Sequence, residues 1–234
     1  MSTEKRHFVT AIILAAGSGA RMGSDITKQK MLICGESVLR RCIRAFEETL
    51  TIDAIVVVCR EDEKYFVLDE TREFKKVNAI VSGGNTRAES ARYGFASIPS
   101  ETDFVAIHDA ARCLVTPKMI EKIVSEAVNF GAATAAKKVS DSIKRADSNG
   151  VILESVPRED LYAAQTPQIF KAEDYARGLT VSSSDSAITD DNMVVERVGV
   201  KVKCVDCGEI NIKITTPEDV TYAEFIINRR GGDA

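Results

Sequence analysis

The sequence of 234 residues has no tryptophan and only two histidines, His7 and His108. Histidine is the usual general base and a common metal ligand at neutral pH, so mechanisms that need several such side chains have little material here. A reaction whose nucleophile is already ionised needs no base, and this scarcity does not exclude it.

The sequence also lacks a disulfide pattern, an excess of positive charge and long apolar runs. The six cysteines do not follow the spacing of a disulfide framework, and the C-x-x-C pair Cys204 and Cys207 lacks the second pair typical of a zinc site. The net charge of −4 argues against a nucleic-acid-binding protein. No apolar run approaches the roughly 18 residues that span a bilayer, and the first residues do not resemble a signal peptide. We therefore expect a cytoplasmic protein that binds neither nucleic acid nor a membrane.

The chain alternates short β-branched runs with longer stretches of helical periodicity. This alternation is typical of an α/β fold with a mostly parallel sheet, and no linker divides the chain, so we expect a single domain over residues 1–234. Expected strands lie at residues 8–14, 52–59, 77–81, 104–108, 131–139, 166–170, 200–205 and 210–214. Expected helices lie at 37–48, 61–74 and 86–97, and begin after 116, 189 and 216.

Residues 140–158 break this alternation. Two short extended segments, 142–145 and 151–155, flank a turn at 147–150, and the Asn-Gly pair of this turn is a strong hairpin signal. We interpret this stretch as a β-arm that projects from the domain.

The first expected strand leads into the small residues Ala15, Ala16 and Gly17, followed by Gly19 and Gly23. The glycine spacing is G-x-G-x-x-x-G, which matches neither the dinucleotide-binding G-x-G-x-x-G nor the G-x-x-x-x-G-K-[ST] of a P-loop. The backbone N–H groups of such a loop can still bind phosphate oxygens. The loop is therefore a candidate phosphate site of another type.

Further polar groups lie near this loop or at other strand ends. Arg21 and Lys28 follow the loop and can pair with phosphate charge. Gly83 and Gly84 follow a second strand, and Asp109 ends a third, where its carboxylate can bind a ribose hydroxyl or lie near a divalent cation. Open α/β sheets bind ligands at the carboxyl ends of their strands. The sequence therefore predicts at this edge a binding site for a ligand that contains phosphate or sugar.

The chain resembles the 2-C-methyl-D-erythritol 4-phosphate cytidylyltransferases in the order and spacing of LAAGSGARM, TKQ, GGNTRAES, HDAAR, SDSIKR, TPQIF, TDD and NIKITTPED. The resemblance covers about residues 8–227. It implies a doubly wound, mostly parallel α/β sheet of the Rossmann-like nucleotidyltransferase type and a homodimer formed through the β-arm at about 140–158. The implied reaction joins CTP to 2-C-methyl-D-erythritol 4-phosphate and gives 4-diphosphocytidyl-2-C-methyl-D-erythritol and pyrophosphate, a step of the non-mevalonate isoprenoid pathway.

The resemblance also implies roles for individual residues. The implied catalytic residues are Arg21, Lys28, Arg158 and Lys213. The implied CTP-binding residues are Ala15, Ala16, Gly17, Gly83, Gly84, Asn85, Ser90, Asp109 and Ala110. The implied residues for the polyol phosphate are Arg112, Ser142, Thr166 and Thr189. The implied cofactor is Mg²⁺ or another divalent cation, held mainly by the CTP phosphates and near Asp109, with no protein ligand assigned.

Three positions depart from the usual pattern of this family. Thr27 stands where a proline usually precedes the loop lysine, Lys30 and Met31 replace an aromatic-leucine pair, and Ser142 replaces a threonine. The change at Thr27 bears on the stiffness of the loop and leaves its charge unaltered.

Other functions are open at this point. A ribitol-5-phosphate or other polyol-phosphate cytidylyltransferase is the first alternative, because NIKITTP and TPQ occur there too, although AAG and HDAAR favour methylerythritol phosphate. A nucleotide-binding module without catalysis is disfavoured by the intact Arg21, Lys28, Asp109 and Lys213. An NAD-binding oxidoreductase is disfavoured by the glycine spacing.

Overall fold

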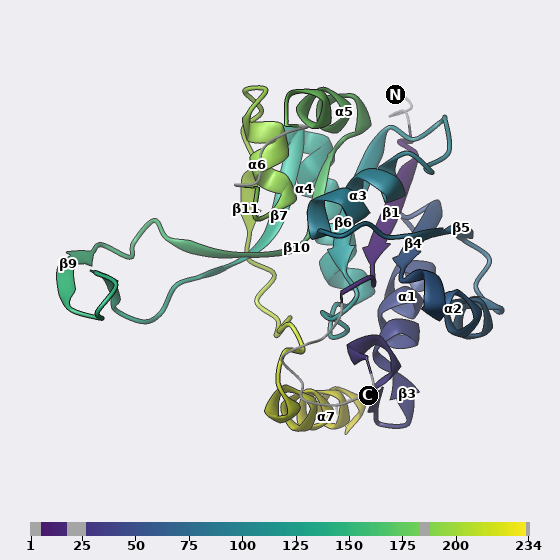
Figure 1. The fold of residues 1–234 in the computed structure, drawn as a ribbon, viewed down its shortest axis with the longest axis horizontal. Coiled ribbons are helices and arrows are strands. Elements are labelled where there is room, and N and C mark those ends of the chain that lie inside the picture. The colour runs from purple at the N-terminus through teal and green to yellow at the C-terminus, as the bar shows by residue number, and fades with distance from the viewer. Residues whose placement is uncertain (1–5, 18–26, 183–187, 233–234) are drawn as a thin grey trace.

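A seven-stranded sheet in the order β11-β7-β10-β6-β1-β4-β5 forms the centre of the computed structural model, which describes residues 6–17, 27–182 and 188–232 (Figure 1). Its strands are β1 (Val9–Leu14), β4 (Ala54–Cys59), β5 (Val77–Ser82), β6 (Phe104–Asp109), β7 (Ala132–Lys138), β10 (Tyr162–Lys171) and β11 (Lys203–Val205). β10 is antiparallel to its neighbours β6 and β7, and every other pairing within this sheet is parallel among the described strands. The expected mostly parallel sheet is confirmed.

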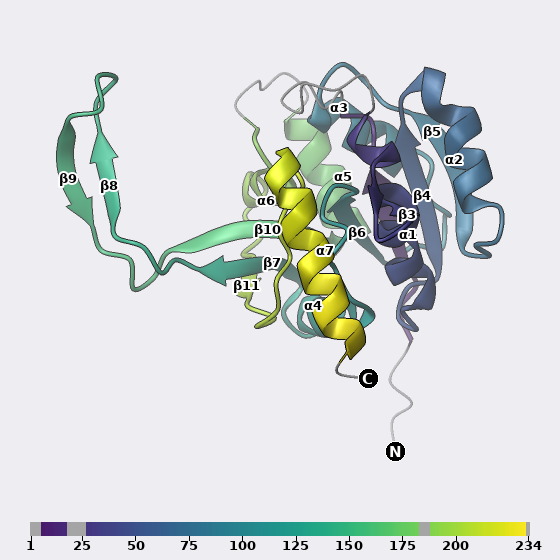
Figure 2. The same ribbon diagram turned by 90° about the horizontal axis from the view of Figure 1, so that it is seen from below.

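Helices cover both faces of this sheet (Figures 1 and 2). One face carries α1 (Val38–Glu48), α2 (Lys64–Thr71) and α4 (Pro117–Phe130), and the other carries α3 (Arg87–Phe95), α5 (Ala172–Val181) and α6 (Asp191–Glu196). Helix α7 (Pro217–Gly232) extends the first core beside the short strand Leu32–Ile33. Successive residues of β1 alternate between the two cores, with Ala11 and Ile13 in the first and Ile12 in the second. Burial on both faces explains why the sequence of β1 is apolar at every position except Thr10.

Short elements complete the described chain. They are η2 (Lys28–Lys30), β2 (Leu32–Ile33), β3 (Glu36–Ser37), η3 (Glu61–Glu63), β8 (Ile143–Ala146) and β9 (Ile152–Val156).

The predicted starts of α3 and α4 are confirmed by their caps. The hydroxyl oxygens of Thr86 and Thr116 accept from the backbone N–H groups three residues later, at 3.0 and 3.3 Å. In α3 the reciprocal contact differs from a capping box, because Glu89 accepts from the backbone N–H of Asn85 at 2.7 Å rather than from that of Thr86. The glutamate therefore also holds the loop that precedes the helix.

The strand expected at 210–214 is wrong, since this segment pairs with no strand in the described chain. Side chains take the place of a neighbouring strand. Arg112 donates to the carbonyl oxygen of Asn211 at 2.8 Å, and Arg230 donates to that of Ile210 at 3.1 Å. The alternating isoleucines produced a strand pattern, whereas the carbonyl groups are satisfied by arginines distant in the sequence.

Helix α5 was not expected from the sequence. Its apolar residues Ala172, Tyr175 and Leu179 follow helical spacing and pack in the second core, so the sequence held a periodic signal that the prediction did not use. Gly178 lies against α6, where an added Cβ would come within 2.4 Å of the Val194 carbonyl oxygen. A small residue at this contact lets the two helices approach closely.

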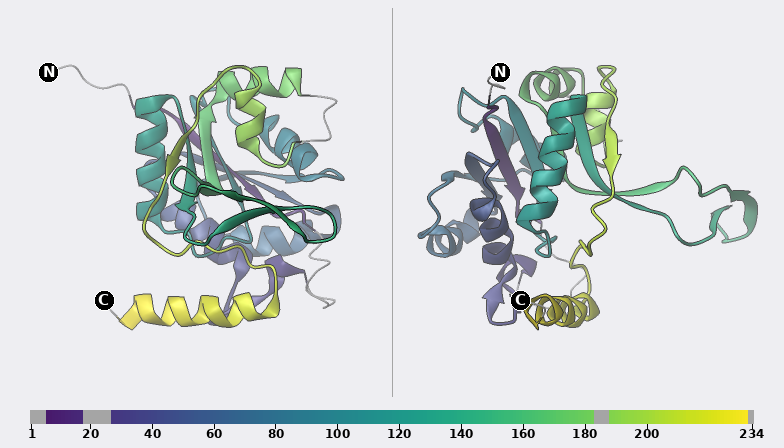
Figure 3. Two further views of the ribbon diagram at one scale, coloured as in Figure 1. Left: turned by 90° about the vertical axis from the view of Figure 1, so that its left-hand side faces the viewer. Right: turned by 180° about the vertical axis from the view of Figure 1, so that it is seen from behind.

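The predicted β-arm projects from the body beyond β7 and β10, on the side of the molecule away from β5 (Figures 1 and 3). Its strands β8 and β9 pair in antiparallel fashion. The apolar side chains of Val151, Ile152 and Leu153 in the arm are exposed on the single chain. The arm therefore presents apolar surface to its surroundings.

No helix within the described ranges has the length and apolar character needed to cross a membrane.

Candidate active site

A cleft of about 420 Å³ lies at the carboxyl ends of β1, β5 and β6. The loop after β1 contributes Ala16 and Gly17, the loop after β5 contributes Gly84 and Asn85, and Asp109 ends β6 at the same edge. This is the edge at which an open α/β sheet binds its ligands, and it is the edge predicted from the sequence.

The loops after β1 and β5 pack directly against each other at Gly83. A Cβ at this position would lie 2.4 Å from the Cβ of Ala16 and 2.8 Å from Oγ of Ser90. The hydroxyl of Ser90 accepts from the backbone N–H of Gly84 at 3.1 Å and donates to the carbonyl oxygen of Thr86 at 2.9 Å. Glycine is required here because any side chain would push the two walls of the cleft apart.

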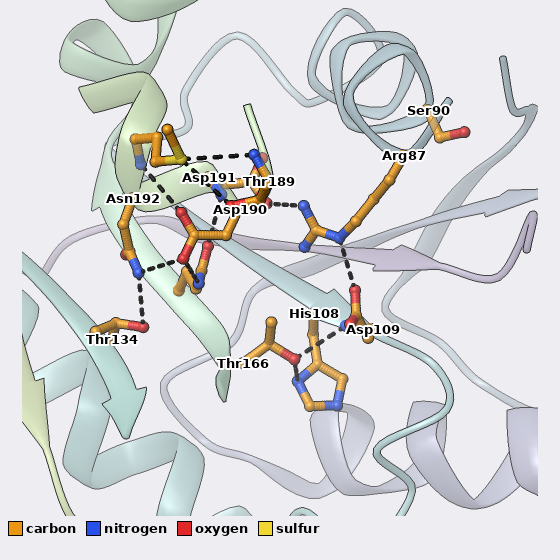
Figure 4. Close-up of polar contacts among 12 residues, drawn as sticks. Arg87, Ser90, His108, Asp109, Thr134, Thr166, Thr189, Asp190, Asp191 and Asn192 are labelled. Carbon is orange, nitrogen blue, oxygen red and sulfur yellow. Dashed lines mark hydrogen bonds and ion pairs between the residues drawn. The ribbon is translucent and has the colours of Figure 1, made fainter. Parts of the chain in front are cut away.

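A network of charged side chains crosses the cleft (Figure 4). Arg87 extends from the first turn of α3 and donates to Asp109 at 3.0 Å and to Asp191 at 2.6 Å. The ammonium group of Lys213 lies 2.7 Å from the second carboxylate oxygen of Asp109. Asp109 is thus held between two cations that come from distant parts of the chain.

The network also sets the ionisation of its members. Burial favours the neutral form of Asp109, but Arg87 and Lys213 outweigh burial and hold the pKa of this carboxyl group well below its usual range. Burial alone would lower the pKa of Arg87, but Asp191 and Asp109 raise it above its ordinary value. Asp109 and Arg87 therefore keep their charges at neutral pH.

Lys28 lies in η2, lines the cleft and is buried, and its ammonium group donates to the carbonyl oxygen of Ile214 at 3.1 Å. The next residue, Gln29, donates from its side-chain amide to the carbonyl oxygens of Ala15 and Gly17. These contacts tie the loop after β1 to the turn that carries Lys28.

A chain of hydrogen bonds, in which each donor and acceptor is fixed, joins His108 and Thr166 to the backbone N–H of Asp109. Nε2 of His108 lies 3.2 Å from the carbonyl oxygen of Arg112, which can only accept, so Nε2 carries the hydrogen. Nδ1 then accepts from the hydroxyl of Thr166 at 3.0 Å, and this hydroxyl accepts from the backbone N–H of Asp109 at 3.1 Å. Burial lowers the pKa of His108 to about 3, and the chain requires this neutral ring.

Comparisons with known proteins agree on one family. The family model of 2-C-methyl-D-erythritol 4-phosphate cytidylyltransferase matches residues 9–229. The chain belongs to this family. Relatives bearing this name from Pelotomaculum thermopropionicum and Lachnospira eligens are 39% and 41% identical, over 96% and 93% of this chain and 96% and 98% of theirs.

A solved structure agrees with the family membership. The crystal structure of 4-diphosphocytidyl-2C-methyl-D-erythritol synthase from Anaerococcus prevotii superposes with a TM-score of 0.83 at 30% identity. The superposition covers 95% of this chain and 97% of the solved chain. The fold of the described residues is therefore that of the cytidylyltransferase family.

Most residues predicted to bind the nucleotide come together in the cleft. Those that line it are Ala16, Gly17, Lys28, Gly84, Asn85, Ser90, Asp109 and Lys213. Ala15, Gly83 and Ala110 lie at the same strand ends, with Ala15 and Ala110 fully buried. Arg21 falls outside the described residues.

The residues predicted to bind the polyol phosphate do not line this cleft. Arg112 contacts Asn211, and Thr189 contacts the sulfur of Met193. Ser142 lies on the arm, where it is exposed, and Thr166 is buried behind Asp109. Arg158, also predicted to be catalytic, is exposed at the base of the arm and donates to the carbonyl oxygen of Ser140.

Arg87, Gln29 and Asp191 form part of the cleft or its charge network, yet sequence reasoning gave none of them a role. Arg87 carried a usable signal, because a cation in the first turn of a helix opposes the helix dipole. The sequence pattern indicated that Asp191 belongs to a helix cap. In the structure Asp190 fills that role by accepting from the backbone N–H of Met193. Gln29 showed no local signal, because its partners precede it by twelve or more positions.

Metal-binding donors are sparse around the cleft. No group of three His, Cys, Asp or Glu side chains in the described ranges is placed to hold a metal ion. Asp109 supplies a carboxylate to the cleft wall, with one oxygen bonded to Arg87 and the other to Lys213.

Proposed function

We propose that this chain is a cytidylyltransferase that joins CTP to 2-C-methyl-D-erythritol 4-phosphate, giving 4-diphosphocytidyl-2-C-methyl-D-erythritol and pyrophosphate. One observation carries the proposal. Lys28, Lys213 and Arg87 converge with glycine-rich backbone at the carboxyl edge of the sheet, in a chain that belongs to the cytidylyltransferase family. We propose that residues 1–234 act as one domain in the cytoplasm.

The reaction needs no general base. An ionised phosphate oxygen of the polyol phosphate attacks the α-phosphorus of CTP and forms a new P–O bond. The bond from the α-phosphorus to the oxygen that bridges it to the β-phosphorus breaks, and pyrophosphate leaves with the electron pair. The protein must hold two polyanions in line and stabilise the negative charge that collects around the α-phosphorus.

Lys28, Lys213 and Arg21 perform this second task. Lys28 and Arg21 bind the triphosphate and the departing pyrophosphate, and Lys213 lies beside the α-phosphate. Because Lys213 is already paired with Asp109, it is held in place before the substrate arrives. Arg87 keeps Asp109 ionised and oriented, which in turn fixes Lys213.

The remaining residues of the cleft bind the nucleoside. Ala15, Ala16 and Gly17 approach the phosphates through their backbone, and Asp109 and Ala110 lie at the ribose. Gly83, Gly84, Asn85 and Ser90 bind the cytosine. Because Gly83 has no side chain, the two walls of the cleft lie close together, and the flat base enters the narrow space between them.

The donor set fits a divalent cation that arrives with the nucleotide. A single carboxylate, that of Asp109, is too few ligands for a protein-held metal cage, and Mg²⁺ is commonly bound by one or two carboxylates together with substrate phosphates. Such an ion neutralises charge on the phosphates.

The residues predicted for the polyol phosphate support a homodimer. Arg158 and Ser142 belong to the arm, which extends away from the body of its own chain (Figure 3). We propose that the arm crosses to a second copy of the chain and that Arg158 completes the partner's site with Arg112, Thr166 and Thr189. The exposed apolar residues of the arm are consistent with such a contact.

Pyrophosphate release with Mg²⁺ tests the reaction. The chain is offered CTP or UTP with either methylerythritol phosphate or ribitol 5-phosphate. We expect release with CTP and methylerythritol phosphate. Release with ribitol phosphate alone would replace the proposed substrate, and no release with any pair would indicate a binding module without catalysis.

A further inference from the structure

Glu63 is a buried carboxylate outside the cleft that the reaction does not use. Its side chain is 3% exposed and lies at the end of η3, between β4 and α2. Burying a carboxylate is costly unless hydrogen bonds or a positive charge compensate for the lost water. An apolar side chain could fill this position at lower cost, so the carboxylate calls for an explanation.

The described partners of the Glu63 carboxylate both belong to one short segment. The hydroxyl of Thr27 donates to Oε1, and the ammonium group of Lys30 lies 3.6 Å from the same oxygen. We call residues 27–31 the Lys28 turn. Glu63 therefore contacts this turn on both sides of Lys28, through Thr27 and Lys30. It lies 36 positions after Thr27 in the sequence.

The internal bonds of the Lys28 turn are few. The backbone N–H of Lys30 donates to Thr27 at 3.0 Å, and that of Met31 donates to Lys28 at 3.3 Å. A single 3₁₀ turn has limited stability of its own. Contacts from outside the turn must therefore set where the ammonium group of Lys28 lies.

We propose that Glu63 is a positioning residue that holds the Lys28 turn, and through it Lys28, against the body of the protein. The proposal rests on the proposed function of Lys28. Gln29 ties the same turn to the loop after β1, so the turn is fastened on two sides. Loss of the Glu63 contact leaves the charge of Lys28 intact but lets its position vary.

The backbone of Thr27 offers a second way to stiffen the turn. Its φ of −67° and ψ of 150° are values that proline adopts without strain. In this chain the position holds Thr27, whose hydroxyl bonds to Glu63, and the ring of a proline would also fit the backbone there. A proline here should restore order to the turn when the Glu63 contact has been removed.

The first test compares Glu63→Leu, which removes the oxygen that accepts from Thr27, with the double variant Thr27→Pro/Glu63→Leu. We expect Glu63→Leu to lower kcat roughly tenfold with a smaller change in KM for CTP, because the charge of Lys28 remains but is misplaced. The double variant should recover to within about threefold of the parent. Glu61→Leu is the matched control, because Glu61 lies in the same 3₁₀ turn but pairs with Lys64 and Ser82.

The second test asks whether the effect passes through Lys28. In a Lys28→Met background, Glu63→Leu should change kcat by less than about twofold, since the group that Glu63 positions is already gone. A full tenfold effect in that background would overturn the proposal. An unchanged kcat for Glu63→Leu in the parent would do so as well.

Hydrogen exchange separates this proposal from the proposed function. The backbone N–H groups of Lys30 and Met31 should exchange faster in Glu63→Leu by about fivefold or more, and proline at position 27 should slow them again. If Lys28→Met kept the parent kcat, the function assigned to Lys28 would fail. Unchanged exchange in Glu63→Leu would instead show that the carboxylate does not hold the turn.

Discussion

At the scale of the residue, Lys28 is the described cation whose removal should affect the transfer step most directly. We expect Lys28→Met to lower kcat by more than about tenfold, a loss of over roughly 1.4 kcal/mol of transition-state stabilisation. Steady-state pyrophosphate release measures this change. Lys64→Met, at the half-buried first residue of α2, serves as the control for removing a lysine. A Lys28→Met enzyme within tenfold of the parent would contradict the charge-based mechanism.

His108 makes a separate prediction about pH and stability. Its pKa is about 3 in the folded protein, against about 6.5 in an unfolded chain. Between these values the unfolded state binds more protons, so the free energy of unfolding falls as the pH decreases from about 6.5 toward 3. At pH 5 this one group should remove about 2 kcal/mol relative to pH 7.

Urea unfolding of the parent and of His108→Gln at pH 7 and pH 5 measures the difference. The amide of glutamine can still donate to the carbonyl oxygen of Arg112 but has no proton to gain. The loss between the two pH values should be about 2 kcal/mol smaller in the variant. Equal losses would mean that the buried ring is already protonated in the folded protein.

Individual site residues differed in how far the sequence could reveal them. Lys28, Asp109 and Lys213 were predicted, because each belongs to a short motif. Arg87 is defined by contacts 22 and 104 positions away in the chain, and no local pattern records contacts at that range. Asp191 gave a local signal that also fits a helix cap, so its bond to Arg87 could be found only in the folded chain.

At the scale of the element, the close approach of two loops at Gly83 gives a sharp test. Gly83→Ala would place a methyl group 2.4 Å from the Cβ of Ala16, and overpacking of this kind costs about 1–3 kcal/mol. We expect a lower free energy of unfolding and a higher Kd for CTP, measured by urea unfolding and calorimetry.

The control for this substitution is Gly231→Ala. Nothing lies within 4 Å of a Cβ at that position near the end of α7, and alanine is favoured in a helix. Its free energy of unfolding should stay within about 0.5 kcal/mol of the parent. If Gly83→Ala behaved in the same way, the two loops would have more freedom than their packing indicates.

Elements that depend on local signals were predicted well. Thr86 and Thr116 marked the starts of their helices, and the Asn149-Gly150 pair marked the arm. The antiparallel direction of β10 carries no local signal, because a strand reads the same in either direction. The segment 210–214 has a strand pattern but reaches no sheet edge, and only the position of the neighbouring arginines explains why.

At the scale of the whole molecule, the proposed exchange of arms predicts that one subunit can repair another. Two variants, Lys28→Met and Arg158→Ala, are coexpressed with different tags and purified as the mixed dimer. One of its two sites then combines an intact Lys28 with an intact Arg158, so we expect about half of the parent activity. Each variant alone should be impaired.

The matched control pairs Lys28→Met with Lys213→Met. Both residues line the cleft of a single chain, so every site in this mixed dimer lacks one of them and no activity should return. A mixed dimer of Lys28→Met and Arg158→Ala that stays inactive would contradict the exchange. So would a parent protein that is monomeric in light scattering and fully active.

The antiparallel pairing of β7 and β10 has a consequence for how such a protein can evolve. The arm leaves and re-enters the sheet at paired positions, with Lys138 opposite Tyr162. Extending or shortening an insertion whose ends already meet changes the closure entropy only slowly. We expect the length and sequence of the arm between Ser142 and Arg158 to drift among descendants while β1, β5 and β6 keep their geometry. Selection can then change how subunits assemble without changing how each one holds its nucleotide.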